Sequence, residues 1–158
     1  MRLEFVKAFV DITQSIFVEA LSTEVITGRL SLESSPRAEG TVVTLIELSG
    51  DVLGRVIMHM EMATAIAIAE RMTGRSEISC SLITSCIAEL AGMAIGRTVS
   101  WINDRSYNIQ MSPPVVAINS QLQPLPNEVE TLVFPLKMEY GDTIINASFI
   151  DLNYSAAD

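Results

Sequence analysis

The residue of this sequence best suited to chemistry is a lone carboxylate, Glu89, which stands among small and apolar residues in the stretch IAELAGMAIG. Gly92 and Gly96 follow it at spacings of three and seven residues, so in a helix all three share one face. A glycine inside a helix costs about 0.5 to 1 kcal/mol relative to alanine, and close approach of another backbone is its usual compensation. A carboxylate on such a face can pair with a cation on whatever approaches it.

Two explanations of this face stay open, and they can also hold together if the two helices pack side by side with their outer faces jointly exposed. In the first, the N-terminal helix of the same chain crosses at the glycines, and Glu89 reaches solvent at the edge. In the second, a partner protein docks on the face, and Glu89 meets a cation of that partner. Helical spacing adds Ser85, one turn earlier, and Ser100 and Asn103 further along to the same face.

An acid and an amide recur at the same three-residue spacing near the N-terminus, as Asp11 and Gln14. A side-chain amide can donate and accept hydrogen bonds and so can orient a water molecule. The pair is therefore a speculative second site. Both residues also lie on an ordinary polar helix face with Lys7 and Ser15, and solvation alone explains that face.

Composition and charge exclude several classes of function. Lys and Arg number 10 against 19 Asp and Glu, a net charge of -9, which disfavours nucleic acid and anionic membranes as partners. His59 is the single histidine, and Cys80 and Cys86 are the two cysteines, so a Cys/His zinc site or a His-based triad cannot be assembled. We expect this chain to bind no metal or cofactor itself.

Length and the N-terminal sequence predict a single cytoplasmic domain over residues 1–158. A chain of 158 residues can bury most of its apolar surface in one core. Glu4 and Asp11 interrupt the region where a signal peptide would be continuously apolar, and no run of residues has the length and apolar composition of a membrane span.

Hydrophobic periodicity predicts the elements that must position Glu89. Apolar residues recur every three or four positions from Leu3 to Leu21, which is typical of an amphipathic helix. A second long helix from Ser81 to Asp104 carries Glu89, and a shorter Ala-rich helix runs from Met60 to Gly74. The apolar stripe expected to meet the sheet consists of Leu82, Cys86, Leu90, Met93, Ala94 and Trp101.

Alternating patterns predict three strands after each long helix. They are Val25–Leu32, Thr41–Leu48, Val52–Met60, Pro114–Ile118, Glu130–Glu139 and Thr143–Leu152. The expected fold is α+β, with one mainly antiparallel sheet of about six strands and the two long helices packed on one of its faces. Near-equal offsets, such as those from Asp11 to Glu89 and from Ser35 to Ser112, suggest an internal α-βββ duplication.

This order of segments resembles the CheX and CheC family of chemotaxis phosphatases over nearly the whole chain. The resemblance rests on FVKAFVDITQSIFVEA, on ITSCIAELAGMAIG in the long helix and on MSPPVVAI. The helix segment matches the place where the family carries Glu-x-x-Asn followed by Met. The run Ser-Pro-Pro-Val matches the family's Ser-x-Pro-x-Val strand start, and a single helix motif at this length fits the CheX-like branch.

The resemblance implies a partner, namely the phosphorylated receiver domain of a CheY-like response regulator in chemotaxis or two-component signalling. The receiver itself would hold the Mg²⁺ ion and the phospho-aspartate, while Glu89 would pair with its active-site lysine. Ser85, Glu89, Gly92 and Gly96 would form the receiver-docking face. The family also implies a homodimer, in which the apolar strands TLVFPLKM and TIINASFI could pair either edge to edge or face to face across the two copies.

The family's Asn, which orients the attacking water, is replaced in this chain by Gly92. Glycine has no side chain with which to orient water, and positioning is most of what phosphoryl transfer requires of a protein. Two functions therefore remain open. One is a receiver-binding module with weak or no phosphatase activity; the other is an active phospho-aspartate phosphatase that uses another amide, such as that of Gln14.

Overall fold

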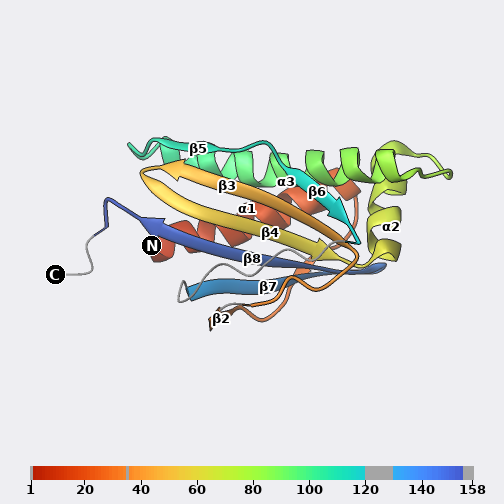
Figure 1. The fold of residues 1–158 in the computed structure, drawn as a ribbon, viewed down its shortest axis with the longest axis horizontal. Helices are drawn as coiled ribbons and strands as arrows, with labels where there is room; N and C mark the ends of the chain where they lie inside the picture. The colour runs from red at the N-terminus through yellow and green to blue at the C-terminus, as the bar shows by residue number, and fades with distance from the viewer. Residues whose placement is uncertain (1, 35, 120–129, 155–158) are drawn as a thin grey trace.

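The computed structural model describes residues 2–34, 36–119 and 130–154 and shows an α+β arrangement (Figure 1). Three helices and eight strands occur among these residues. The helices are α1 (Leu3–Leu21), α2 (Met62–Thr73) and α3 (Cys80–Asn103). The strands are β1 (Ile26–Thr27), β2 (Ser31–Ser34), β3 (Val42–Gly50), β4 (Val52–Met60), β5 (Ile109–Met111), β6 (Val115–Ile118), β7 (Glu130–Met138) and β8 (Gly141–Asp151).

The strands form one antiparallel sheet with α1 and α3 together behind it and α2 at one end (Figure 1). The sheet order is β1-β7-β8-β4-β3-β5, with β2 also paired to β7 and β6 also paired to β3. The predicted α+β class and the two long helices on one face are confirmed. The expected number of about six strands is too low, because two short strands extend each edge of the sheet.

The predicted strand Val25–Leu32 is wrong as a single element. It divides into β1 and β2, which both pair with β7 and not with the next strand along the chain. Between them, the Gly28 amide donates a hydrogen bond to the Pro135 carbonyl at 2.8 Å. TLVFPLKM and TIINASFI, in β7 and β8, lie inside the sheet, so they cannot form the edge of a dimer.

The short edge strands of each half of the chain pair with a long strand of the other half. The short strands that follow α1 add to β7 from the second half, and the short strands that follow α3 add to β3 from the first half. Each half thus supplies one long helix and four strands to one continuous sheet. The internal duplication itself stays a prediction.

Helix α1 covers the middle of the sheet with an aromatic side. Phe5, Phe9 and Phe17 are buried, and the ring of Phe9 meets that of Phe134 of β7 edge-on at 5.8 Å. Burial of one such side chain stabilises a fold by about 1.5 to 3 kcal/mol. The helix ends at Ser22, which adopts the left-handed conformation with φ of 48°.

Helix α3 packs beside α1 and against β3, β5 and β6. Ser79 caps its start by accepting a hydrogen bond from the Leu82 amide at 3.1 Å. By length and by a mean hydropathy of 1.3, α3 could cross a membrane, contrary to the expectation from the sequence, but half of its most apolar window is buried inside the fold. Core packing of residues such as Ile87 and Leu90 accounts for this apolar composition.

The stability of the fold should depend on the protonation of His59, which is buried in β4. Burial lowers the pKa of His59 below its usual 6.5, and the nearby Glu39 carbonyl, Asn146, and the charges of Glu39 and Glu61 offset only part of this effect. Because the unfolded chain then binds more protons, stability is full above pH 6.5 and decreases as the pH falls below it.

We therefore expect the free energy of unfolding to fall between pH 7 and pH 5.5 through this group. Urea unfolding of the wild type and of His59→Gln at several pH values measures the effect. The variant should show a shallower dependence on pH over this range. Parallel profiles would mean that His59 does not titrate differently in the folded state.

Candidate functional site

The outer side of α3 is a ridge of exposed residues that starts near the α2–α3 turn. Ser85, Glu89, Met93 and Arg97 follow one another at four-residue spacing, and all four are exposed. Met93, which the sequence predicts to meet the sheet, is 37% exposed, so that prediction is wrong. Residues such as Ile83, Ile87 and Ile95 contribute more to the core-facing side.

The two glycines lie beside this ridge, half-buried, and they face the end of β5 and the segment that joins it to β6. A Cβ atom added to Gly92 would lie 3.5 Å from Cγ of Pro114, and one added to Gly96 would lie 3.7 Å from Sδ of Met111. These are ordinary van der Waals distances to side chains. The explanation that α1 crosses at the glycines is therefore wrong, because no backbone of α1 approaches them.

Helix α1 instead passes α3 on another side. The Arg97 guanidinium donates to the Glu19 carboxylate of α1 at 3.4 Å, and both side chains are more than half exposed. An ion pair this exposed contributes little to stability. It does show that α1 borders the ridge beyond Met93.

Glu89 is exposed, and it makes no hydrogen bond or ion pair within the described part of the chain. Its charge acts on Cys86, one turn away: burial first, and then the negative charge of Glu89, raise the pKa of the Cys86 thiol. That thiol is therefore a packed, protonated group. The Glu89 carboxylate remains available to a cation from outside.

Other residues predicted for this face lie elsewhere or have structural roles. Asn103 is half-buried, and its side chain bonds both backbone groups of Ile109, donating to the carbonyl at 3.0 Å and accepting from the amide at 2.8 Å. It therefore fixes the turn from α3 into β5. Ser100 is exposed near the end of the helix.

The speculative second site is divided. Asp11 is exposed on α1 without a hydrogen bond or ion pair to the described residues. The Gln14 side chain instead donates a hydrogen bond from Nε2 to the Val25 carbonyl at 2.7 Å, which ties α1 to the segment that follows it. Half of the Gln14 amide is thus committed to holding the fold.

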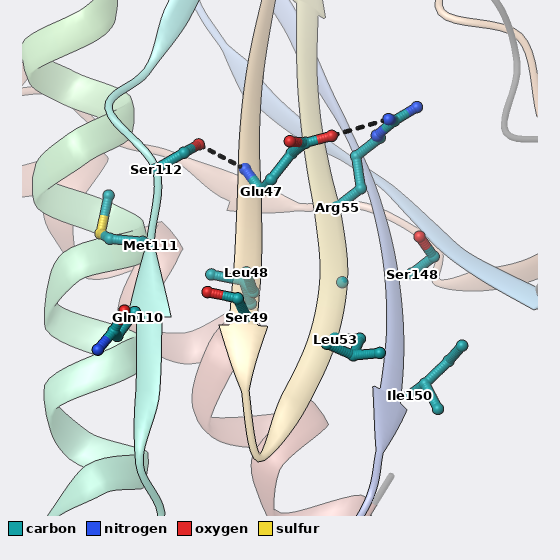
Figure 2. Close-up of a pocket in the computed structure, with 11 residues that line it drawn as sticks. Glu47, Leu48, Ser49, Leu53, Arg55, Gln110, Met111, Ser112, Ser148 and Ile150 are labelled. Carbon is teal, nitrogen blue, oxygen red and sulfur yellow. Dashed lines mark hydrogen bonds and ion pairs between the residues drawn. The ribbon is translucent and has the colours of Figure 1, made fainter.

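Two concave regions were not expected from the sequence. An open pocket of about 540 Å³ lies at the start of α3, and Ser85 is part of its wall together with Arg75, Glu77, Ile78, Ser79, Ser81 and Leu82. A groove of about 480 Å³ lies on the face of the sheet away from the helices, where Arg55 donates to Glu47 at 2.9 Å (Figure 2). Strand pairing creates the groove, and a single sequence carries little signal for such pairing.

The groove ends at the same segment that touches the glycines. Ser112 donates its amide hydrogen to the Glu47 carbonyl at 2.8 Å, and its hydroxyl oxygen accepts from the Glu47 amide at 2.9 Å (Figure 2). These two bonds fasten the segment Met111–Pro114 to β3. Two consecutive prolines, Pro113 and Pro114, stiffen it further because each ring fixes its φ angle.

Among the described residues, no three His, Cys, Asp or Glu side chains gather where they could hold a metal ion. The site on α3 is thus defined by a free carboxylate and its neighbours. It offers one negative charge, a half-buried glycine three residues later, and an exposed methionine one turn later. Such a surface suits recognition of a protein partner that carries a cation.

Comparison with known proteins supports the resemblance seen in the sequence. The family model described as "Chemotaxis phosphatase CheX" matches residues 42–137, which include Glu89. The CheY-P phosphatase CheX of Thermotoga maritima is 25% identical over 125 residues, a match that covers 78% of this chain and 81% of that protein.

Solved structures show the same fold. The chemotaxis protein CheX of Desulfovibrio desulfuricans superposes with a TM-score of 0.83 at 17% identity, covering 94% of this chain and 100% of the other. CheX in the CheX–CheY–BeF3–Mg²⁺ complex of Borrelia burgdorferi gives a TM-score of 0.83 at 18% identity, covering 94% and 99%. With more than half of its length matched by the family model, this chain belongs to the CheX family of chemotaxis phosphatases.

Proposed function

We propose that this protein binds the phosphorylated receiver domain of a CheY-like response regulator through α3 and hydrolyses its acyl phosphate weakly or not at all. The observation that carries the proposal is the pairing of a free, exposed Glu89 with a glycine three residues later. The carboxylate provides a partner for the receiver's lysine. Gly92 provides no group to orient water.

The relative from Borrelia burgdorferi supports the choice of partner, because its structure contains CheY with BeF3 and Mg²⁺. Beryllofluoride stands in for the phosphoryl group of a phospho-aspartate. By analogy, the Mg²⁺ ion and the phosphoryl group would belong to the receiver, and this chain would bring the residues around them. Its own residues would exclude water from the receiver site and would pair with the lysine.

Loss of the Asn explains why hydrolysis is expected to be slow. In-line attack needs a water molecule held opposite the leaving oxygen, and most of the barrier reduction in phosphoryl transfer comes from such positioning. Both backbone groups of Gly92 lie within α3, so neither is free to hold that water. A module of this kind would sequester or report the phosphorylated receiver.

An active phosphatase is the alternative function, with Gln14 or another amide in place of the Asn. The hydrogen bond from Gln14 to Val25 argues against Gln14, because moving its amide to a receiver would break a contact at 2.7 Å that holds α1. The deciding experiment follows the loss of phosphate from a phosphorylated CheY-like receiver of the same organism. A strong acceleration by the wild-type protein would favour the alternative.

The proposal includes a homodimer that acts in the cytoplasm. Ile26, Leu30 and Leu32 are 43 to 63% exposed along the edge of the sheet formed by β1 and β2. An edge with unpaired backbone groups and apolar side chains is prone to pair with another chain. We therefore place the dimer contact at this edge, in place of the β7 and β8 contact expected from the sequence.

Light scattering at micromolar concentration should give twice the monomer mass of 17.2 kDa. Leu32→Lys should shift the mass toward the monomer, because it places a charge in the apolar contact. Val115→Lys is the matched control, since Val115 is 62% exposed against 63% for Leu32 and lies on the opposite edge. A monomeric wild type, or equal behaviour of the two variants, would contradict this assignment.

A further inference from the structure

We infer that the receiver-binding surface of α3 is a carboxylate between two apolar walls, Met93 on one side and the proline pair Pro113–Pro114 on the other, and that these walls seal Glu89 from water when the partner docks. The inference rests on the proposed receiver binding. Beyond receiver binding itself, Met93 and the proline pair would determine the affinity, and they would set the chemistry that the partner must present.

The arrangement follows from helix geometry and two contacts. Successive residues of a helix are turned by about 100°, so Glu89 projects between the directions of Gly92 and Met93. Gly92 faces Pro114, whose Cγ lies 3.5 Å from the position of an added Cβ. Met93 lies toward Arg97, which bonds Glu19 of α1 at 3.4 Å. Glu89 thus stands between an apolar group on each side.

Both walls are accessible and one is rigid. Met93 is 37% exposed and Pro113 is exposed. The proline pair follows Ser112, which is fastened to β3 by its two hydrogen bonds with Glu47, one of which is drawn in Figure 2. The segment lies against the helix at Gly92, where an added Cβ atom would meet Cγ of Pro114 at 3.5 Å, an ordinary van der Waals distance.

Apolar walls around a charge have a definite effect on binding. A surface ion pair contributes little in water, but the attraction grows when neighbouring contacts exclude water and lower the effective dielectric constant. Apolar residues around a central charged contact do this in protein interfaces. The partner must therefore present an ammonium or guanidinium group with apolar side chains beside it that can rest on Met93 and on the proline pair.

The test measures affinity for a beryllofluoride- and Mg²⁺-activated CheY-like receiver of the same organism, at low and high salt, by calorimetry or fluorescence titration. Met93→Ala should weaken binding about five- to tenfold and should make binding more sensitive to salt, because the ion pair is then less shielded. Met93→Leu should restore the affinity to within about twofold, since it restores the apolar area.

Leu53→Ala is the matched control, because Leu53 is 42% exposed, similar to Met93, but lies in the groove on the opposite face of the sheet (Figure 2). It should leave the affinity unchanged, and melting curves establish that each variant is folded. Equal losses of affinity for Met93→Ala and Leu53→Ala would overturn the inference. An unchanged affinity of Met93→Ala would also overturn it if Glu89→Lys no longer binds the receiver. That last result would contradict only the role of Met93 and would leave the proposed receiver binding through Glu89 in place. A wild-type protein that fails to bind the receiver would contradict both proposals.

Discussion

The Gly92→Asn variant is expected to gain phosphatase activity, with the rate of receiver dephosphorylation rising by about tenfold to 10²-fold over the wild type. The substitution places an amide three residues after Glu89, where the family motif carries one. The fold has room for it: the nearest atom to the new Cβ would be Cγ of Pro114 at 3.5 Å. Asn is also a better helix former than Gly, so stability should be kept or slightly improved.

Two controls separate the amide from the backbone effect. Gly92→Ala raises the helix propensity by more than Asn does but adds no amide, and it should leave the rate unchanged. Gly96→Asn places the same amide one turn later, where an added Cβ would lie 3.7 Å from Met111 Sδ, and should also be inactive. If Gly92→Asn is folded and binds the phosphorylated receiver without any rate increase, the site has diverged beyond one residue and the transferred mechanism is wrong.

The Glu89→Lys variant should lose most of its affinity for the activated receiver. Replacing one partner of a desolvated ion pair by a like charge costs on the order of 2 kcal/mol or more, which is about a 30-fold increase in Kd. Glu89 has no ion pair within the described residues that the change would break, so the free protein should remain folded. Titration of the beryllofluoride-activated receiver gives the Kd directly.

Glu130→Lys serves as the control for net charge. Glu130 is exposed at the start of β7, opposite Ser34 of β2, on the side of the sheet away from α3. It should change the Kd by less than about twofold at moderate salt, since exposed charges beyond the contact are screened. Equal losses of receiver affinity for Glu89→Lys and Glu130→Lys would indicate only a general electrostatic effect. Glu89 would then not belong to the docking surface.

The long elements of the fold are predictable from sequence because periodicity is a local property. The helix Leu3–Leu21 and the strand Val52–Met60 have the predicted bounds. Strands β1, β2 and β5 are two to four residues long, too short for an alternating pattern to stand out. Their partners lie far along the chain, and no local pattern in one sequence specifies such pairing.

The exposure of Glu89 was predictable from the sequence, whereas the residues around it were not. Glu89 is exposed on α3, as partner docking requires, because a lone acid on an otherwise apolar helix marks the solvent side. Met93 was misjudged because its hydropathy is that of a core residue, although its angle on the helix is close to that of Glu89. The neighbours of Gly92 could not be known, since Pro114 reaches it only through the pairing of β6 with β3.

The exchange of edge strands between the two halves has a consequence for biosynthesis. Ser31 of β2 and its hydrogen-bond partner Val133 of β7 are separated by 102 positions, so β2 has no place in the sheet until β7 has left the ribosome. Pairings of such high contact order are slow to form, because loop closure comes before any compensating contact. The nascent N-terminal half, with the three phenylalanines of α1 still uncovered, is therefore the species most exposed to aggregation and to chaperones during translation.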